Sequence, residues 1–142
     1  MTLKQVYTIY NTLMKLHRKY AADVNVKRLQ EVVSDINELN ATINHPMCND
    51  LTGVFYCQCK GGLGLAGEAF IKSLYADLWL FHRKLIEEYP NPKTEPTIQE
   101  FWTKANEECR KLAEKYNMEQ SGICKQYLIA IMESAERDAV EK

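Results

Sequence analysis

Apolar side chains recur at steps of three and four residues along most of this 142-residue chain. This spacing places them on one face of an α-helix, whereas a half-buried β-strand requires strict alternation. A first stretch of this kind covers residues 3–20, and a second covers residues 29–43. Asn44 and Pro46 end the second stretch, because the residue before a proline disfavours helical geometry.

Three further helical stretches follow at residues 66–89, 97–116 and from 123 onward. The stretch at 66–89 is apolar nearly all round the helix, so we expect it to be buried on several sides. Residues 97–100 read Thr-Ile-Gln-Glu, a capping-box pattern that starts the next helix. No repeat with a period of 20–50 residues is present, which argues against a solenoid. We therefore predict an all-α protein, one domain over residues 1–142, with about five helices in a bundle-like array around a buried central helix at 66–89.

The composition fits a soluble globular protein. It is 46% hydrophobic and 26% charged with a net charge of −1, which argues against a disordered chain and against a uniformly basic nucleic-acid coat. No run approaches the roughly 18 apolar residues of a membrane span, and no secretory signal is recognisable. We therefore expect a cytoplasmic protein whose five cysteines are reduced thiols or metal ligands.

Residues 44–67 interrupt the helical pattern. They hold five of the six glycines and three of the five cysteines. Connections of this length in compact domains are usually functional or disordered, and the aromatic and β-branched residues at 52–56 favour order. We expect one long Gly- and Cys-rich loop, or a short β-hairpin, between the second and third helices.

This segment offers a possible metal site at His45, Cys48, Cys57 and Cys59. One imidazole and three thiols suit tetrahedral zinc, although paired zinc cysteines are usually separated by two to four residues and not by one. The alternative is that these thiols are small apolar side chains that fill gaps against the core. Zinc binding at these four residues is a hypothesis, and we expect no other cofactor.

The same segment ends in a Gly-x-Gly-x-x-Gly pattern formed by Gly62, Gly64 and Gly67. Such glycines let backbone N–H groups approach a phosphate or nucleotide at a helix N-terminus. A dinucleotide-binding unit needs a second parallel strand after the helix, which this sequence does not predict, and Glu68 would repel an anion. The alternative is that the glycines permit tight packing and a sharp entry into the helix.

Basic residues are concentrated near the start of the chain. Residues 1–30 contain six basic side chains and a single acid, Asp23. An acidic partner or a nucleic acid could bind this corner, or the charges could form a solvated face balanced by acids on later helices. The candidate contact residues are Lys4, Lys15, Lys19, Lys27 and Arg28.

Catalytic patterns are scarce. His17 and His82 each fall on an apolar helical stripe, where we expect core histidines with one bonded nitrogen. No serine elbow and no zincin or di-iron spacing occurs, although Cys57 or Cys59 could act as a nucleophile beside a histidine. Of the eight tyrosines, we expect several to edge a groove or an interface.

The sequence therefore predicts a small cytoplasmic helical module for protein interaction or regulation, without evident catalytic machinery. Its partner would be another protein or a second copy of the chain, bound at a tyrosine-rimmed groove, at residues 44–67 or at the basic corner. The alternative is a small-ligand (anion or nucleotide) or zinc-binding protein, with its site on residues 44–67 and the start of the third helix.

Overall fold

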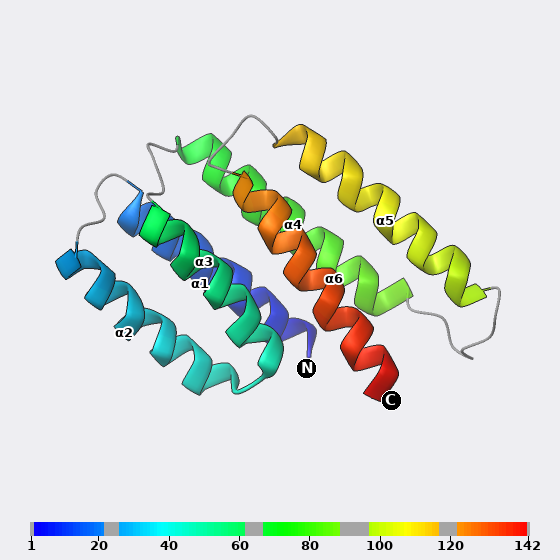
Figure 1. Cartoon of the computed structure of the whole chain (residues 1–142), viewed down its shortest axis with the longest axis horizontal. Coiled ribbons are helices and arrows are strands. Elements are labelled where there is room, and N and C mark those ends of the chain that lie inside the picture. The colour runs from blue at the N-terminus through cyan, green and yellow to red at the C-terminus, as the bar shows by residue number, and fades with distance from the viewer. Residues whose placement is uncertain (1, 22–25, 62–66, 89–96, 117–121, 142) are drawn as a thin grey trace.

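The computed structural model describes residues 2–21, 26–61, 67–88, 97–116 and 122–141 (Figure 1). The helices in these ranges are α1 (Leu3–Tyr20), α2 (Val26–Ile43), α3 (Pro46–Gly61), α4 (Glu68–Glu88), α5 (Thr97–Lys115) and α6 (Ile123–Glu141). The all-α prediction is confirmed, with six helices in the described ranges where about five were expected. No helix within these ranges is long and apolar enough to cross a membrane.

The structure does not confirm the long loop or hairpin at residues 44–67, because α3 occupies most of that segment. Pro46 starts α3 at a position where a helix has no use for the missing N–H. His45 caps the new helix, since its carbonyl accepts from the Cys48 and Asn49 amides and its Nδ1 accepts from the Met47 amide at 3.1 Å. The buried residues of α3 recur at helical steps: Met47, Cys48, Leu51, Thr52, Phe55 and Cys59.

The centre of the fold is formed by four of the six helices, α1, α3, α4 and α6. α1 packs mainly against α4 and α3 mainly against α6, while α2 covers α1 and α3 and α5 covers α4 and α6. Figure 1 shows α2 and α5 along opposite edges, with α3 and α6 in front of α1 and α4. The predicted central helix corresponds to α4, which packs against α1, α5 and α6.

α1 and α4 have related sequences. Tyr10 and His17 of α1 recur 65 positions later as Tyr75 and His82 of α4, and Arg-Lys follows each histidine. Apolar pairs with the same spacing are also buried in both helices. They include Val6 with Ile71, Ile9 with Leu74, Leu13 with Leu78, and Leu16 with Phe81. α1 and α4 therefore share one pattern of buried residues, including the tyrosine and the histidine.

The remaining helices correspond by the pattern of their core-facing positions. In α2 and α5 the spacing is 73, which pairs Val32, Ile36, Leu39 and Ile43 with Ala105, Cys109, Leu112 and Tyr116. In α3 and α6 the spacing is 76, which pairs Met47, Cys48, Leu51 and Phe55 with Ile123, Cys124, Tyr127 and Ile131. An ion pair recurs too, because Lys19–Asp35 between α1 and α2 is matched by Lys84–Glu108 between α4 and α5.

The two sets of helices are related by an approximate two-fold rotation. In Figure 1, a half-turn about the viewing direction carries α1, α2 and α3 onto α4, α5 and α6, each of which runs opposite to its counterpart. We call α1–α3 the first half and α4–α6 the second half. Because both halves use one helical framework, comparing equivalent positions shows where they differ.

Candidate functional site

Two buried tyrosine–histidine pairs join α1 to α4. The Tyr10 hydroxyl lies 2.7 Å from His82 Nδ1, and the Tyr75 hydroxyl lies 2.9 Å from His17 Nδ1. Tyr75 shares a further hydrogen bond of 2.9 Å with the Tyr127 hydroxyl on α6. The pairs are reciprocal, since Tyr10 corresponds to Tyr75 and His17 to His82. Both histidines are core residues with one nitrogen bonded, as predicted.

These groups are held in their neutral forms. Burial lowers the pKa of His17 to about 4, and burial together with the neighbouring His45 lowers the pKa of His82 to about 4. Burial also raises the pKa of Tyr75 and of Tyr127. Neutral, enclosed groups suit a polar contact within the core, whereas a general acid or base must reach a substrate. We therefore infer that this hydrogen-bond network stabilises the fold and takes no part in catalysis.

The tyrosines mostly fill the core and do not edge a groove. Tyr10, Tyr75, Tyr116 and Tyr127 are buried, and the Tyr116 hydroxyl donates to Asp77. Tyr7 differs from these four, because it is 51% exposed and meets the Trp79 ring edge-on.

The four residues of the zinc hypothesis lie along one helix. His45 directly precedes α3, and the three cysteines belong to it. Cys48 and Cys59 are eleven positions apart, which is about 16 Å along a helix axis. Both are buried, whereas Cys57 is exposed. α3 therefore does not bring the four side chains together, and no group of three His, Cys, Asp or Glu residues in the described ranges is placed to hold a metal ion.

The thiols that face the core are poor nucleophiles. Burial raises the pKa of Cys48 to about 11 and that of Cys59 to about 12. The thiolate is the reactive form of cysteine, so these two groups are unreactive at neutral pH. Cys57 is solvent-exposed on the outer face of α3.

The anion hypothesis falls partly outside the described residues, where Gly62 and Gly64 lie. Gly67 is exposed directly before α4, and its carbonyl accepts from the Ile71 amide at 3.1 Å. Glu68 follows, and it accepts from Arg18 Nε of α1 at 2.9 Å. This ion pair places a carboxylate at the start of α4, where it opposes an anionic ligand.

Two members of the basic corner make contacts within the chain. Lys19 Nζ lies 3.0 Å from Asp35, and Arg28 donates to the Lys19 carbonyl at 2.8 Å while lying over the Tyr20 ring. These contacts join α1 to α2, so the two charges contribute to helix packing. All four lysines of the group are exposed, and Lys4, Lys15 and Lys27 are the three besides Lys19.

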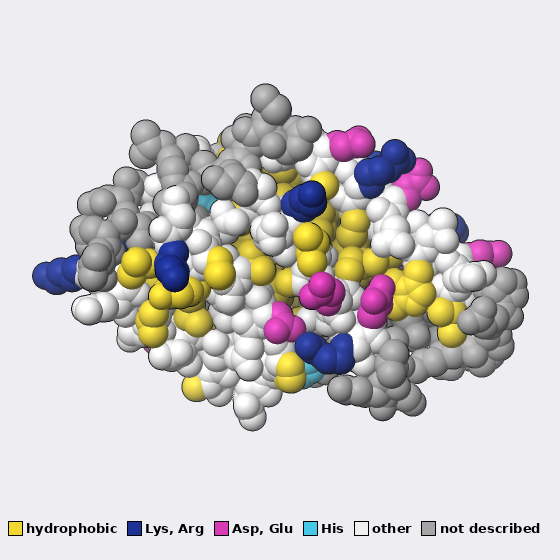
Figure 2. Space-filling model, in the orientation of Figure 1, with side chains coloured by type: hydrophobic (Ala, Val, Ile, Leu, Met, Phe, Trp, Pro, Cys, Tyr) yellow, Lys and Arg dark blue, Asp and Glu magenta, His cyan; other side chains and the backbone are white. Residues whose placement is uncertain are grey.

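A groove of about 380 Å³ runs between α5 and α6. Figure 2 shows hydrophobic side chains exposed on this face between the two helices. Ile129 in its lining is 42% exposed, and it falls outside the helical steps that join Tyr127, Leu128, Ile131 and Met132. The apolar lining consists of Cys109, Ala113, Leu128, Ile129 and Met132, and the charged rim consists of Arg110, Lys125, Glu133 and Glu136.

Two of the positions equivalent to this apolar lining are polar in the first half, whereas Ile36 and Tyr56 stand at the places of Cys109 and Met132. Asn40 and Thr52 take the places of Ala113 and Leu128, and Asn40 Nδ2 donates to Thr52 Oγ1 at 3.1 Å. Gly53 takes the place of Ile129. α2 and α3 are therefore joined by a hydrogen bond at the level where α5 and α6 present apolar surface.

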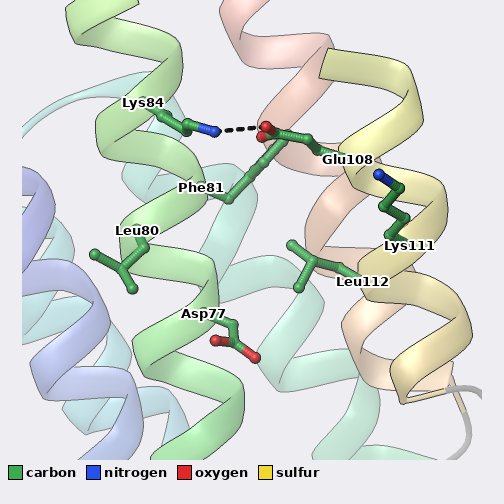
Figure 3. A pocket seen from close by; sticks show the side chains of 7 residues that line it. All are labelled: Asp77, Leu80, Phe81, Lys84, Glu108, Lys111 and Leu112. Carbon is green, nitrogen blue, oxygen red and sulfur yellow. Dashed lines mark hydrogen bonds and ion pairs between the residues drawn. The ribbon is translucent and has the colours of Figure 1, made fainter. Parts of the chain in front are cut away.

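A second groove, of about 280 Å³, lies between α4 and α5 (Figure 3). Phe81 and Leu112 point into the space between the helices, and Leu80 at its edge is 54% exposed. Lys84 and Glu108 bridge the groove at 2.6 Å, as Lys19 and Asp35 bridge α1 and α2. An ion pair crosses this groove and recurs in the first half, so this groove is the weaker candidate.

The α5–α6 groove is therefore the candidate site that the geometry supports. Comparison of the chain with protein-family models, with curated proteins and with solved structures finds no match.

Proposed function

We propose that this protein is a helical module for protein interaction or regulation, and that its binding surface is the α5–α6 groove. The observation that carries the proposal is the difference between the halves. The first half has a hydrogen-bonded Asn40–Thr52 pair, and the second half has apolar Ala113 and Leu128 at the same positions.

The groove has the composition of an interface, with an apolar centre inside a charged rim. Burying an isoleucine side chain gains about 1.5–3 kcal/mol, and much of that gain is unrealised while Ile129 stays exposed. Gly53 shows that the framework does not need a large side chain at this position. Met132 adds an adaptable apolar contact, which suits recognition of a partner.

The proposal includes no catalytic role, because the buried histidines are neutral and the core thiols have raised pKa values. The alternatives have less support. α3 spreads the four zinc candidates along its length, and Glu68 opposes an anion at the start of α4. We also propose a cytoplasmic location, supported by five free cysteines, which are expected in a reducing compartment.

Site-specific photo-crosslinking tests the function. Ile129 is replaced by p-benzoylphenylalanine in the full chain, expressed in its native host, and Gly53 is replaced in a matched control. A side chain fits at Gly53, since nothing lies within 4 Å of its added Cβ. We expect a discrete protein adduct from position 129 and none from position 53. No adduct from position 129, or equal adducts from both positions, would contradict the proposal.

A further inference from the structure

We infer that the partner at the α5–α6 groove is a second copy of this chain, whose α6 lies antiparallel to the first α6 across a two-fold axis. This inference rests on the proposed function and names the occupant of its groove. In this arrangement the same surface patch serves both copies.

The exposed face of α6 has a charge pattern that complements itself. Lys125 stands at one end and Glu136 at the other, with Ile129 and Met132 between them. Two such helices in antiparallel register pair Lys125 of one copy with Glu136 of the other, and Ile129 with Met132. The axis lies between Ile129 and Met132, so each copy makes both contacts.

The rim charge on α5 follows the same order as the charges on α6, with a basic residue at the Lys125 end of the groove. Cys124 Sγ lies 3.9 Å from the Leu112 carbonyl, and α5 and α6 pack side by side in opposite directions (Figure 1). Arg110 therefore lies at the Lys125 end of the groove, away from Glu133 and Glu136. A second copy turned by a half-turn brings this basic end onto the acidic end of the first.

The rim charges are available for this pairing. Among the described residues, Lys125, Glu133 and Glu136 take part in no ion pair, whereas Arg110 has only an exposed neighbour on its own helix, Glu107, at 3.4 Å. Opposite charges left unpaired at the two ends of an apolar surface favour an antiparallel copy and disfavour a parallel one, which would place like charges together.

The first half does not repeat this pattern. The α3 positions equivalent to the α6 face combine one cation with an aromatic residue and with polar and small residues, and they hold no acid. They are Asn49, Gly53, Tyr56, Cys57 and Lys60. Self-complementary charge therefore belongs to the second half alone, together with the apolar groove.

Charge reversal with mixing tests the inference by sedimentation velocity of the full chain. Lys125→Glu places two like-charge pairs in the symmetric dimer, and so does Glu136→Lys. We expect each variant alone to self-associate at least about tenfold more weakly than wild type. An equimolar mixture of the two variants restores opposite charges at both ends, so we expect it to form a heterodimer. Lys60→Glu, at the α3 position equivalent to Glu136, makes the same charge change as Lys125→Glu and should leave association unchanged.

Two results would overturn the inference. The first is a wild-type chain that stays monomeric at hundreds of micromolar, and the second is a mixture that associates no better than its separate components. An adduct at position 129 with a different protein would also overturn it, while leaving the interaction function in place. Failure of the interaction function is distinguished by the absence of any adduct from that position.

Discussion

The Tyr10 hydroxyl on α1 lies 2.7 Å from His82 Nδ1 on α4, and the equivalent residues Tyr75 and His17 form the same contact in the reverse direction. The two contacts hold α1 against α4 through a polar link inside an apolar core. Buried polar groups raise the free energy of the folded state when a partner is removed, so this link can be tested by deleting single hydroxyls.

Removing the Tyr75 hydroxyl should destabilise the fold more than removing the Tyr10 hydroxyl. Tyr75 contacts both His17 and Tyr127, whereas Tyr10 contacts His82. We expect Tyr75→Phe to lower the free energy of unfolding by about 2–3 kcal/mol and Tyr10→Phe by about 1–2 kcal/mol, measured by urea denaturation. Tyr7→Phe, at an exposed position, serves as control with a change within about 0.5 kcal/mol. Equal effects at positions 7 and 75 would refute the structural role of the network.

Stability should fall as the solution is acidified from pH 6.5 to pH 4. The pKa of His17 and that of His82 are about 4 in the folded protein, below the ordinary value of 6.5. The unfolded chain therefore binds more protons than the folded protein between pH 6.5 and pH 4. The contribution of the two neutral histidines to stability is fully present above this window and is lost as the pH falls through it. Each histidine contributes a slope of up to about 1.4 kcal/mol per pH unit.

Urea titrations at several pH values measure this slope. His82→Asn removes one titrating group, so the slope between pH 6.5 and pH 4 should fall to about half, even though the variant is less stable at pH 7. A slope that does not differ from wild type would show that His82 does not titrate as a buried group.

Thiol labelling should separate the cysteines of α3. Cys57 is exposed, whereas Cys48 and Cys59 are buried with raised pKa values. We expect iodoacetamide at pH 7.5 to alkylate Cys57 at least about tenfold faster than either neighbour, followed by peptide mass spectrometry. The same experiment tests the zinc hypothesis, because a zinc site would protect Cys57 together with the other two thiols.

The helices with a continuous apolar stripe could be predicted from the sequence, and α3 could not. Its Val54-Phe55-Tyr56 segment is rich in strand-forming residues, and its glycines and cysteines suggest an irregular connection. Tertiary packing decides the outcome, since Met47, Leu51 and Phe55 share one buried helical face. Gly53 faces solvent, so its missing side chain leaves no cavity in the core.

The sequence pattern does not predict the two-fold arrangement, for a different reason. Its spacing of 65 residues between α1 and α4 exceeds the periods of solenoid repeats. Outside Tyr10, His17 and their counterparts, the halves share buried positions more than residue identities. The groove is not predicted either, because it depends on which faces of α5 and α6 remain uncovered. Ile129, which falls outside the apolar stripe of its helix, is the signal that the sequence offers for it.

Sedimentation velocity of wild type, Ile129→Asp and Gly53→Asp over a dilution series tests most directly that the second-half groove is the self-docking surface. Both variants place the same acid at equivalent exposed helix positions. We expect reversible dimerisation of the wild-type 16.5 kDa chain and an unchanged dissociation constant for Gly53→Asp. For Ile129→Asp we expect a dissociation constant at least about tenfold larger, without loss of folded structure. A monomeric wild type, or equal weakening by both variants, would contradict self-docking through this groove.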